Sequence, residues 1–380
     1  MIRLDPARYQ IKNADKLISP ALIYYEEIIR DNIELMIRIA GGADRLWPHV
    51  KSHKSLDFVK MTMEYGLYRF KCAIIPEAEM VAKAGAKQAI LAYPLVGPNI
   101  QRLIDLIKTY PATEFFAIGD DEGQLQLLSN AAEKSGVKVN LLLDINDGLD
   151  RTGIKTAKAG ELYRKTATMP GICVRGMHVY DGQRHENDAD DRSGRVFVDV
   201  QPVFALRREL QAEGLDVGIM VMGGTPSFPC HVKDADETVL SNEKGVYFSP
   251  GTCLIQDYGY AENFPDLPFE IGAMLLTRVV SHPSEGVFTV DLGCKAVATD
   301  PAIPRAYLAG YEDCTTLMQN EEHWVLKMPA GKEDQRPAIG TELYAAPVHI
   351  CPTSALYPEL LIARKGEIAD RWMVTARNRW

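Results

Sequence analysis

Short apolar runs alternate with longer amphipathic stretches along the chain, from about residue 21 to residue 224. The short runs are almost continuous in apolar residues, as expected for parallel strands that are covered on both faces. Between them, apolar residues recur at the spacing of one helix face. The pattern predicts strands at 21–25, 46–51, 70–75, 88–93, 114–118, 137–145, 172–180 and 217–222, each of the first seven followed by a helical segment.

This alternation predicts an α/β fold, a (β/α)8 TIM-type barrel, with a doubly wound open sheet as the competing arrangement. The barrel is favoured because the count of strands is eight and every strand ends in a polar or glycine-rich turn. After residue 249 the rhythm changes to short β-type runs broken by Gly and Pro, which indicates a separate β domain. We therefore expect a barrel over 1–248 and a C-terminal β domain over 249–380. As an alternative, residues 1–20 belong to the β domain rather than to the barrel.

Composition narrows the class of protein. A chain of 380 residues is long enough for two domains, and 46% hydrophobic with 24% charged residues is typical of a water-soluble globular protein. The net charge of -9, without long Lys/Arg runs, argues against a nucleic-acid partner. We see no apolar stretch near the roughly 20 residues that cross a membrane and no signal peptide. Seven scattered cysteines without a CxxC pair indicate reduced thiols, so we expect a cytoplasmic protein.

The segment Trp47–Lys54 concentrates two lysines and two histidines where a predicted strand ends. Strand alternation places His49 and Lys51 on one face. A lysine at this position, aimed into an enclosed site, is suited to form a Schiff base, because burial and neighbouring cations lower its pKa and free the amine. The alternative interpretation is a solvated basic turn.

Other predicted strand ends carry further polar groups. Arg151 follows one strand, and His178 and Tyr180 share a face at the end of another. The turn Gly223-Gly224-Thr225 follows the eighth predicted strand, where barrels often bind phosphate through backbone N–H groups, although Gly-Gly is otherwise an ordinary turn signal. A Schiff-base lysine, a phosphate-binding turn and a strand-end Tyr and Arg together indicate a pyridoxal phosphate site.

Taken together, these segments resemble the fold-type III pyridoxal phosphate enzymes with the alanine racemase fold. Within that group the chain is most similar to the D-threonine aldolase and D-serine dehydratase family. The resemblance covers nearly the whole chain. It is carried by Pro20-Ala21-Leu22, Pro48-His49-Val50-Lys51-Ser52-His53-Lys54, Asp150-Arg151-Thr152-Gly153, His178-Val179-Tyr180-Asp181-Gly182, Gly223-Gly224-Thr225-Pro226 and Pro250-Gly251-Thr252.

The resemblance implies a role for each matching residue. Lys51 would hold the cofactor as a Schiff base, with His49 in the same cofactor-binding motif. Arg151 would lie by the phenolic oxygen of the cofactor, and Tyr180 would approach its pyridine nitrogen. The phosphate would be bound by the turn residues Gly223, Gly224 and Thr225.

The segment around His349 and Cys351 contributes a candidate metal site. Two residues two apart on an extended segment project to the same side, which suits one divalent ion, although a chance surface pair is an equal alternative. The resemblance implies a metal pair here, and a thiolate favours Zn over Mn or Mg. Many relatives carry a His directly after Tyr-x-Gly, where this chain has Gln183. His185, two residues later, is therefore our candidate for the base that acts on the hydroxyl.

By its resemblance the chain is identified as a pyridoxal phosphate- and metal-dependent lyase acting on D-3-hydroxy amino acids. The expected reaction is D-threonine aldolase-like and gives glycine and an aldehyde. One alternative is a D-serine or D-3-hydroxyaspartate dehydratase, which would give a 2-oxo acid and ammonia. Another alternative is an amino-acid racemase, which would not require the metal pair. A further alternative is a non-catalytic cofactor-binding protein, but such proteins are usually a barrel alone, and the residues after 249 argue against it. The expected partners are a small D-amino acid and, for this fold family, a second copy in a homodimer.

Overall fold

A computed structural model describes residues 1–232 and 243–379, which form two compact units. The unit that we call the sheet unit comprises Met1–Leu35, Ser52–Phe58 and Thr252–Arg377. The other, called the barrel unit, comprises Met36–Lys51 and Val59–Gly251, together with the residues from Asn378 on. The chain therefore passes between the units several times, and each is described separately below.

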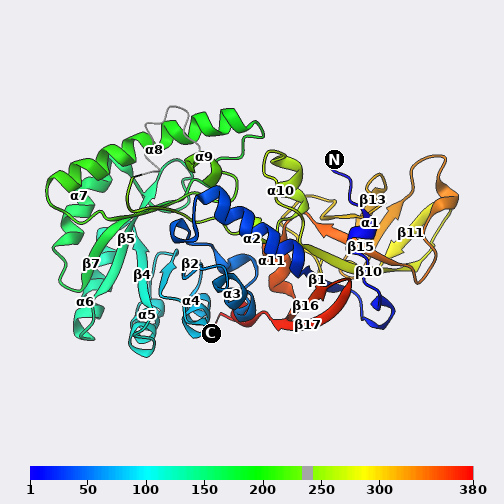
Figure 1. Ribbon diagram of the computed structural model, residues 1–380, viewed down its shortest axis with the longest axis horizontal. Coiled ribbons are helices and arrows are strands. Elements are labelled where there is room, and N and C mark those ends of the chain that lie inside the picture. The colour runs from blue at the N-terminus through cyan, green and yellow to red at the C-terminus, as the bar shows by residue number, and fades with distance from the viewer. Residues whose placement is uncertain (233–242, 380) are drawn as a thin grey trace. The chain divides into compact units, whose positions relative to one another are not determined.

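The barrel unit is built on an eight-stranded parallel sheet in the described part of the chain (Figure 1). Its order is β2-β3-β4-β5-β7-β8-β9, and the short strand β6 also pairs with β5. The strands are β2 (Arg69–Cys72), β3 (Gln88–Leu91), β4 (Glu114–Gly119), β5 (Val139–Asn146), β6 (Ile154–Lys155), β7 (Ile172–Val179), β8 (Ile219–Met222) and β9 (Val246–Phe248).

The segment that precedes Lys51 closes this sheet into a ring. Leu46 forms a parallel bridge with Phe248 of β9, and His49 forms one with Lys71 of β2. Two backbone hydrogen bonds support the closure, one from the Trp47 N–H to the Phe248 carbonyl (2.8 Å) and one from the Lys71 N–H to the Pro48 carbonyl (3.0 Å). The sheet is therefore a barrel, in which the segment 46–49 takes the place of a regular strand.

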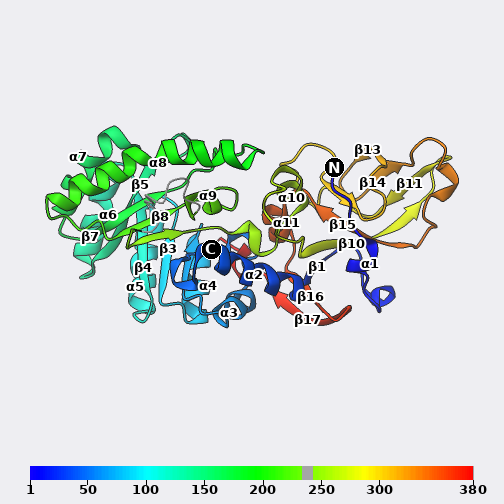
Figure 2. The same cartoon turned by 45° about the horizontal axis from the view of Figure 1, so that its top comes forward.

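Amphipathic helices cover the outside of the barrel; α4 packs on β2 and β3, for example, and α7 on β5 and β7 (Figure 2). The interior holds an apolar cluster to which four strands and the closing segment contribute, made of Trp47, Ile90, Phe116, Ile118, Leu142 and Val221. The helices are α4 (Ile75–Ala84), α5 (Pro98–Thr109), α6 (Glu122–Lys134), α7 (Thr156–Ala167), α8 (Ala189–Ala212) and α9 (Phe228–Val232), while α2 (Glu26–Ala40) and α3 (Leu56–Met63) have residues in both units.

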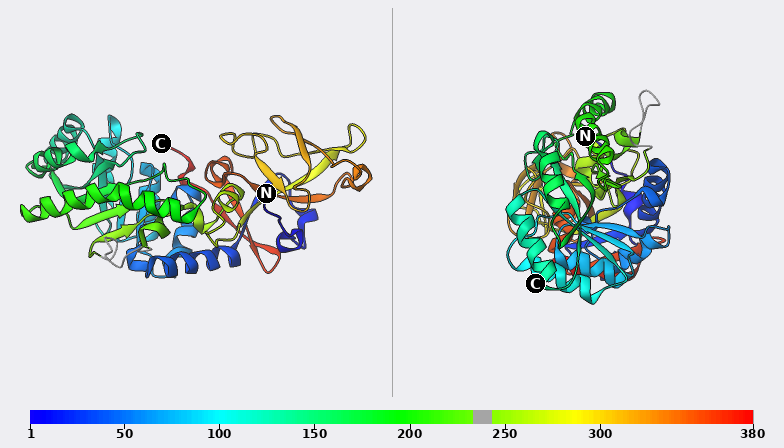
Figure 3. Two further views of the ribbon diagram at one scale, coloured as in Figure 1. Left: turned by 90° about the horizontal axis from the view of Figure 1, so that it is seen from above. Right: turned by 90° about the vertical axis from the view of Figure 1, so that its left-hand side faces the viewer.

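The sheet unit is built on a nine-stranded sheet whose main path is β13-β14-β11-β10-β1-β16-β17, with β15 paired to β10 and to β12. Most of its strands are coloured yellow to red in Figure 3. Its strands are β1 (Ala21–Tyr25), β10 (Ala273–Ser281), β11 (Val287–Val290), β12 (Ala306–Leu308), β13 (Thr315–Gln319), β14 (Trp324–Lys327), β15 (Glu342–Pro347), β16 (Glu359–Arg364) and β17 (Glu367–Met373). Its helices are α1 (Pro6–Tyr9), α10 (Tyr258–Asn263) and α11 (Ile350–Leu356). Among the described residues, no helix combines the length and the apolar character needed to span a membrane.

The strand Ala21–Tyr25 was predicted as the first strand of the barrel, and that assignment is wrong. β1 pairs antiparallel with β10 and parallel with β16, so it lies in the sheet unit. Ile23 and Tyr25 accordingly pack with Met274 and Leu361 in the core of that unit. A short apolar run indicates a buried strand but does not specify which sheet buries it.

The barrel strand that the sequence pattern missed is β9 (Val246–Phe248). It has only three residues, which is too short for a recognisable periodicity. The predicted count of eight barrel strands therefore included β1, which lies in the sheet unit, and omitted β9. Residues 1–35 fall in the sheet unit. The sequence had placed them in the barrel domain, with the β domain as the alternative for residues 1–20.

Candidate active site

Lys51 lies in a single 3-10 turn, Val50–Ser52, directly after the segment that closes the barrel. Its side chain is half-buried, whereas His49 is buried. The Nδ1 atom of His49 accepts a hydrogen bond from the Lys51 backbone N–H (3.3 Å). Gly251 lies close against His49, since a Cβ atom at residue 251 would be 2.9 Å from that of His49. These contacts fix the backbone from which the predicted cofactor lysine projects.

A polar layer lies above the apolar cluster in the barrel. Residues two apart on a strand face the same side. Asp144 comes two residues after Leu142 of the cluster, and Ser249 comes two residues after Tyr247, which packs against the cluster. Asp144 and His178 form a buried pair at 2.7 Å through the Nδ1 atom of His178. Burial and the nearby Lys71 lower the pKa of His178 despite the Asp144 carboxylate. Its Nε2 atom is buried and has no hydrogen-bond partner among the described residues.

Arg151 and Tyr180 are brought together, as the resemblance implied. The guanidinium carbon of Arg151 lies 4.9 Å from the centre of the Tyr180 ring. Asn146 shapes the loop that carries Arg151, because its side-chain oxygen accepts hydrogen bonds from the N–H groups of Gly148 (3.0 Å) and Asp150 (3.1 Å). An exposed arginine and an aromatic ring thus meet at the carboxyl end of the strands.

The turn Gly223–Thr225 follows β8, and Gly223 has a φ of +71°, a conformation that favours glycine. The Gly224 N–H donates to Ser227 Oγ (2.9 Å), and Ser227 Oγ donates to Asp181 (2.6 Å). Asp181 also binds His231 Nε2 at 2.7 Å. Burial alone would raise the pKa of Asp181, but His231 and the hydrogen bonds to its carboxylate lower it overall. A buried polar network therefore holds the predicted phosphate turn in shape.

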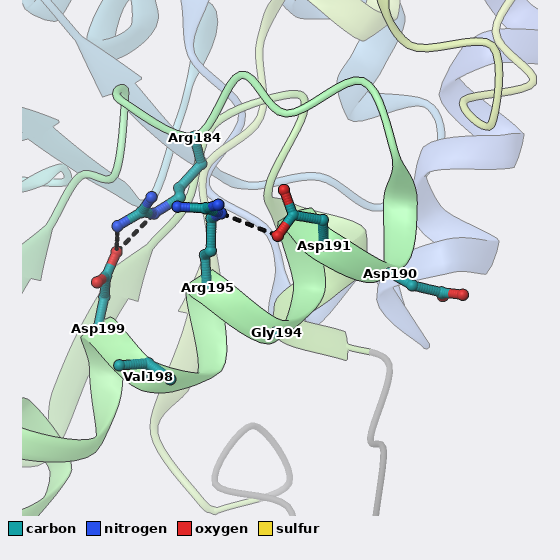
Figure 4. Close-up of a pocket in the computed structure, with 7 residues that line it drawn as sticks. All are labelled: Arg184, Asp190, Asp191, Gly194, Arg195, Val198 and Asp199. Atoms are coloured by element: carbon teal, nitrogen blue, oxygen red, sulfur yellow. Dashed lines mark hydrogen bonds and ion pairs between the residues drawn. The ribbon is translucent and has the colours of Figure 1, made fainter.

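His185, the predicted base, is exposed on the loop between β7 and α8. Arg184, the residue before His185, lines a hollow of about 590 Å³, drawn in Figure 4, in which Arg184 pairs with Asp199 and Arg195 with Asp191. The hollow is lined by Arg184, Asp190, Asp191, Gly194, Arg195, Val198 and Asp199. None of these is a predicted site residue, and the catalytic role of His185 stays a prediction.

In the sheet unit, His349 immediately precedes α11 and Cys351 lies in its first turn. The expected extended segment is thus wrong for Cys351. The pair nevertheless interacts: burial lowers the pKa of His349, but Cys351, Asp300 and Asp257 outweigh it and raise that pKa to about 9. The Cys351 sulfur also contacts Ser52 Oγ (3.0 Å) and Thr252 Oγ1 (3.4 Å). Asp257 accepts a hydrogen bond from the Ile350 N–H (3.0 Å) and so fixes the backbone between the two side chains.

Among the residues that the structure describes, no group of three or more His, Cys, Asp or Glu side chains has the geometry to hold a metal ion. The pair of His349 and Cys351 therefore supplies at most two protein ligands, with Asp300 bound to the Nδ1 atom of His349. An imidazole and a thiolate are ligands that zinc accepts, and a site with few protein ligands leaves positions for substrate. The donor set fits a catalytic ion better than a structural one.

Sequence reasoning missed Lys71 on β2. Its side chain is 3% exposed, and its Nζ atom donates to Ser249 Oγ at 2.9 Å. The same Nζ lies 4.8 Å from the centre of the Tyr180 ring, on which Arg151 also packs. The available signal was a lysine inside an otherwise apolar predicted strand at 70–75. The sequence also gave no indication that Asp181 and His231, 50 positions apart, support one turn.

Comparison with known proteins agrees with this arrangement. The model of the family described as "Alanine racemase, N-terminal domain" matches residues 26–239, and the model described as "Putative serine dehydratase domain" matches residues 272–363. A 3-hydroxy-D-aspartate aldolase of Paracoccus denitrificans is 27% identical over 95% of this chain and 92% of the relative. A D-threo-3-hydroxyaspartate dehydratase of a Delftia species is 22% identical over 89% of this chain and 92% of the relative. The crystal structure of D-threonine aldolase from Filomicrobium marinum superposes with a TM-score of 0.86 at 26% identity, covering 98% of this chain and 99% of that one.

Because the first of these models covers more than half of the chain, the protein belongs to the alanine racemase N-terminal domain family. The fold is that of alanine racemase-like proteins, with a parallel barrel sheet and a second sheet domain, as predicted. The protein is a lyase of the pyridoxal phosphate-dependent class.

The barrel unit fits this cofactor on three observations. The turn at Gly223 and Gly224 is crowded, since a Cβ at Gly224 would lie 3.1 Å from the Tyr180 ring, which would have to move by a few tenths of an ångström. The buried Nε2 atom of His178 has no partner among the described residues. Lys51, Lys71 and Arg151 concentrate positive charge that an anionic phosphate ester would neutralise. Lys51 would bind the aldehyde, and the turn would bind the phosphate.

Gly224→Val is expected to weaken pyridoxal phosphate binding by about 100-fold, which corresponds to ~2.7 kcal/mol. The added side chain would displace Tyr180 or fill the space next to the backbone N–H groups. Fluorescence titration of the cofactor measures the change. Gly194→Val is the control, because a Cβ at this α8 residue meets nothing within 4 Å. Equal affinities in the two variants would contradict a phosphate site at this turn.

Proposed function

We propose that this protein is a pyridoxal phosphate- and divalent-metal-dependent lyase that cleaves D-3-hydroxy amino acids to glycine and an aldehyde, in the manner of a D-threonine aldolase. The observation that supports this most is the presence in one chain of two sets of side chains. The barrel unit carries a strand-end lysine, a Tyr–Arg stack and a phosphate-type turn. The sheet unit carries the interacting pair His349 and Cys351.

Each part of the chain has a limited chemical task in this proposal. Lys51 supplies the amine that holds the cofactor, and the Asp144–His178 pair keeps one imidazole in a fixed orientation in the polar layer of the barrel. The bound cofactor supplies an electron sink for the pair left on Cα when the Cα–Cβ bond breaks. His185 is proposed to take the proton from the β-hydroxyl, so that the departing carbon leaves as an aldehyde.

The metal belongs to the proposal as well. His349 and Cys351 would hold one divalent ion, and the thiolate favours zinc over manganese or magnesium. Such an ion would act as a Lewis acid toward the hydroxyl of the substrate. We also propose that the protein is cytoplasmic and works as a homodimer. The cysteines of the described structure form no disulfide with one another, which agrees with a reducing compartment.

A dehydratase acting on D-serine or D-3-hydroxyaspartate is the second candidate. It is favoured by the match of residues 272–363 to the serine dehydratase model and by the relative named as a D-threo-3-hydroxyaspartate dehydratase. In that reaction the Cα proton is removed and the hydroxyl leaves, which gives a 2-oxo acid and ammonia.

Product analysis tests the proposal. The protein loaded with pyridoxal phosphate and Zn or Mn is incubated with D-threonine, D-serine and D-3-hydroxyaspartate, and the products are identified by mass spectrometry. Glycine with an aldehyde supports the aldolase. A 2-oxo acid with ammonia supports the dehydratase, and loss of optical rotation without cleavage would indicate a racemase and overturn the proposal.

Removal of the metal by a chelator is expected to abolish lyase activity while leaving cofactor absorbance and thermal stability nearly unchanged. The reason is that an ion with two protein ligands serves the substrate rather than the fold. His349→Ala should behave like the chelated protein and should not be rescued by added metal. His282→Ala is a matched control, since this histidine of the sheet unit is also half-buried and its Nε2 atom forms a hydrogen bond with the Pro337 carbonyl (2.8 Å). Full activity after exhaustive chelation, with no metal found by elemental analysis, would rule out the metal site.

A further inference from the structure

Lys71 is a buried basic residue on a barrel strand, and the proposed function assigns no task to it. It lies on β2, where its backbone forms a parallel bridge with His49, two residues before Lys51. Its side chain is 3% exposed. An ammonium group in such a place is costly unless charges of opposite sign or several hydrogen bonds compensate for the lost water.

The contacts of Lys71 connect it to the predicted cofactor site. Its Nζ atom donates to Ser249 Oγ (2.9 Å), and that hydroxyl donates to the carbonyl of Gly223 (2.9 Å), the first residue of the phosphate-type turn. The amine also lies over the face of the Tyr180 ring, at 4.8 Å from its centre. A lysine amine has three donor positions when charged, and one hydroxyl with one ring face leaves it incompletely satisfied.

The charges around Lys71 do not neutralise it. No carboxylate of the described residues lies within ion-pair distance of its Nζ atom. Asp144 and Asp181, which are near enough to favour the charged form, are each bound to a histidine, His178 and His231.

The remaining charged groups around Lys71 are cations. Lys51 from the 3-10 turn and Arg151 from the loop after β5 disfavour the charged form. Burial first, and then Lys51, lower the pKa of Lys71 from 10.5 to about 7. The described residues around Lys71 therefore leave its charge without a carboxylate partner.

We propose that Lys71 is a cofactor-binding residue, and that it takes up a proton when a dianionic phosphate ester occupies the barrel. This inference rests on the proposed function, because it takes the ester to be pyridoxal phosphate. An anion bound near Lys71 would supply a charge of opposite sign, so binding of the anion and protonation of Lys71 favour each other. By linkage, a proton taken up on binding makes the affinity fall as the pH rises.

Pyridoxine 5'-phosphate is the probe that isolates this effect. It carries an alcohol in place of the aldehyde, so Lys51 cannot bond to it covalently. Isothermal titration calorimetry at pH 8, in two buffers of different ionisation enthalpy, counts the protons exchanged on binding. We expect the wild type to take up close to one proton more than Lys71→Met. Between pH 7 and 9 the affinity of the wild type for the probe should fall with rising pH, relative to that of the variant, by about tenfold for each pH unit.

Lys87→Met is the matched control. Lys87 also places its amine near a tyrosine ring, at 5.3 Å from the centre of Tyr68, but it is exposed. This variant should keep the proton uptake and the pH profile of the wild type. A merely structural role for Lys71 would change the affinity without changing the number of protons. If Lys71→Met does not fold, Lys71→Gln replaces it.

Two results would overturn the inference: binding of the probe by wild-type protein without proton uptake at pH 8, or equal uptake in the wild type and a folded Lys71 variant. Failure of the proposed function is distinguishable from both. In that case pyridoxal phosphate itself would not label any lysine after borohydride reduction. If Lys51 is labelled while Lys71 has no effect on proton uptake, the function stands and only this inference is lost.

Discussion

Lys51→Ala is expected to abolish both the covalent attachment of pyridoxal phosphate and turnover. Lys51 lies directly after the segment that closes the barrel. The His49 side chain accepts a hydrogen bond from the Lys51 backbone N–H, and Gly251 lies close against His49. Without its amine the aldehyde of the cofactor has no nucleophile at this position. Borohydride reduction followed by peptide mass spectrometry identifies the labelled lysine, and loss of visible absorbance of the bound cofactor gives an independent measure.

Lys54→Ala is the control, because Lys54 lies three residues later and is outside the 3-10 turn. This variant should keep the label, the absorbance and most of the activity. The buried amine of Lys71 is the one competitor that the described structure offers in the barrel interior, since its pKa is lowered to about 7. A label on Lys71 or Lys54 in the wild-type protein would show that the assignment of Lys51 is wrong.

The stability of the cofactor-free protein is expected to rise with pH between about 7 and 10 because of Lys71. In the unfolded chain this amine has an ordinary pKa of 10.5, whereas in the folded protein burial and Lys51 lower the pKa to about 7. Below pH 7 both states hold the proton, and the cost of burying the charge is fully present. Between the two values the folded state loses the proton first, so the free energy of unfolding increases with pH.

The pKa difference corresponds to about 4–5 kcal/mol at most, at ~1.36 kcal/mol for each pH unit. Denaturant unfolding of wild type and Lys71→Met across pH 6 to 10 measures it. The stability difference should favour the methionine variant most at pH 6 and should shrink steadily toward pH 10. Lys87→Met should follow the wild type, because its amine is exposed. A difference that stays constant with pH would show that the folded protein does not lower the pKa of Lys71, as expected if its charge is already compensated.

Much of the fold was predictable from local patterns. The barrel strands from β2 to β8, except the two-residue β6, and the helices that follow them have continuous apolar runs and helical periodicity, which report burial on a scale of a few residues. Polar groups at strand ends are costly unless they are satisfied or functional, and on that ground the sequence predicted candidate site residues. These are His49, Lys51, Arg151, Tyr180 and the Gly223–Thr225 turn. The stack of Arg151 on Tyr180 confirms that two of them lie together.

What the sequence could not specify depends on pairing between distant segments. β1 has the same apolar character as a barrel strand, yet its partners are β10 and β16, some 250 and 340 residues further along the chain. β9 is too short to show a period, and the 46–49 segment closes the barrel through isolated bridges. Strand partners are chosen by the packing of side chains on both faces of a sheet, which a local pattern does not contain.

The sequence by itself thus determined the class of fold and the identity of the groups that can do chemistry. Tertiary structure alone decided their surroundings. Lys71 is a buried amine over the Tyr180 ring because of the side of β2 on which it lies. Asp181, just after β7, binds His231 and Ser227 because the fold brings these distant segments together at the turn. A pKa or a phosphate-type turn depends on burial and on neighbours from several elements, and those neighbours are set only when the barrel has closed.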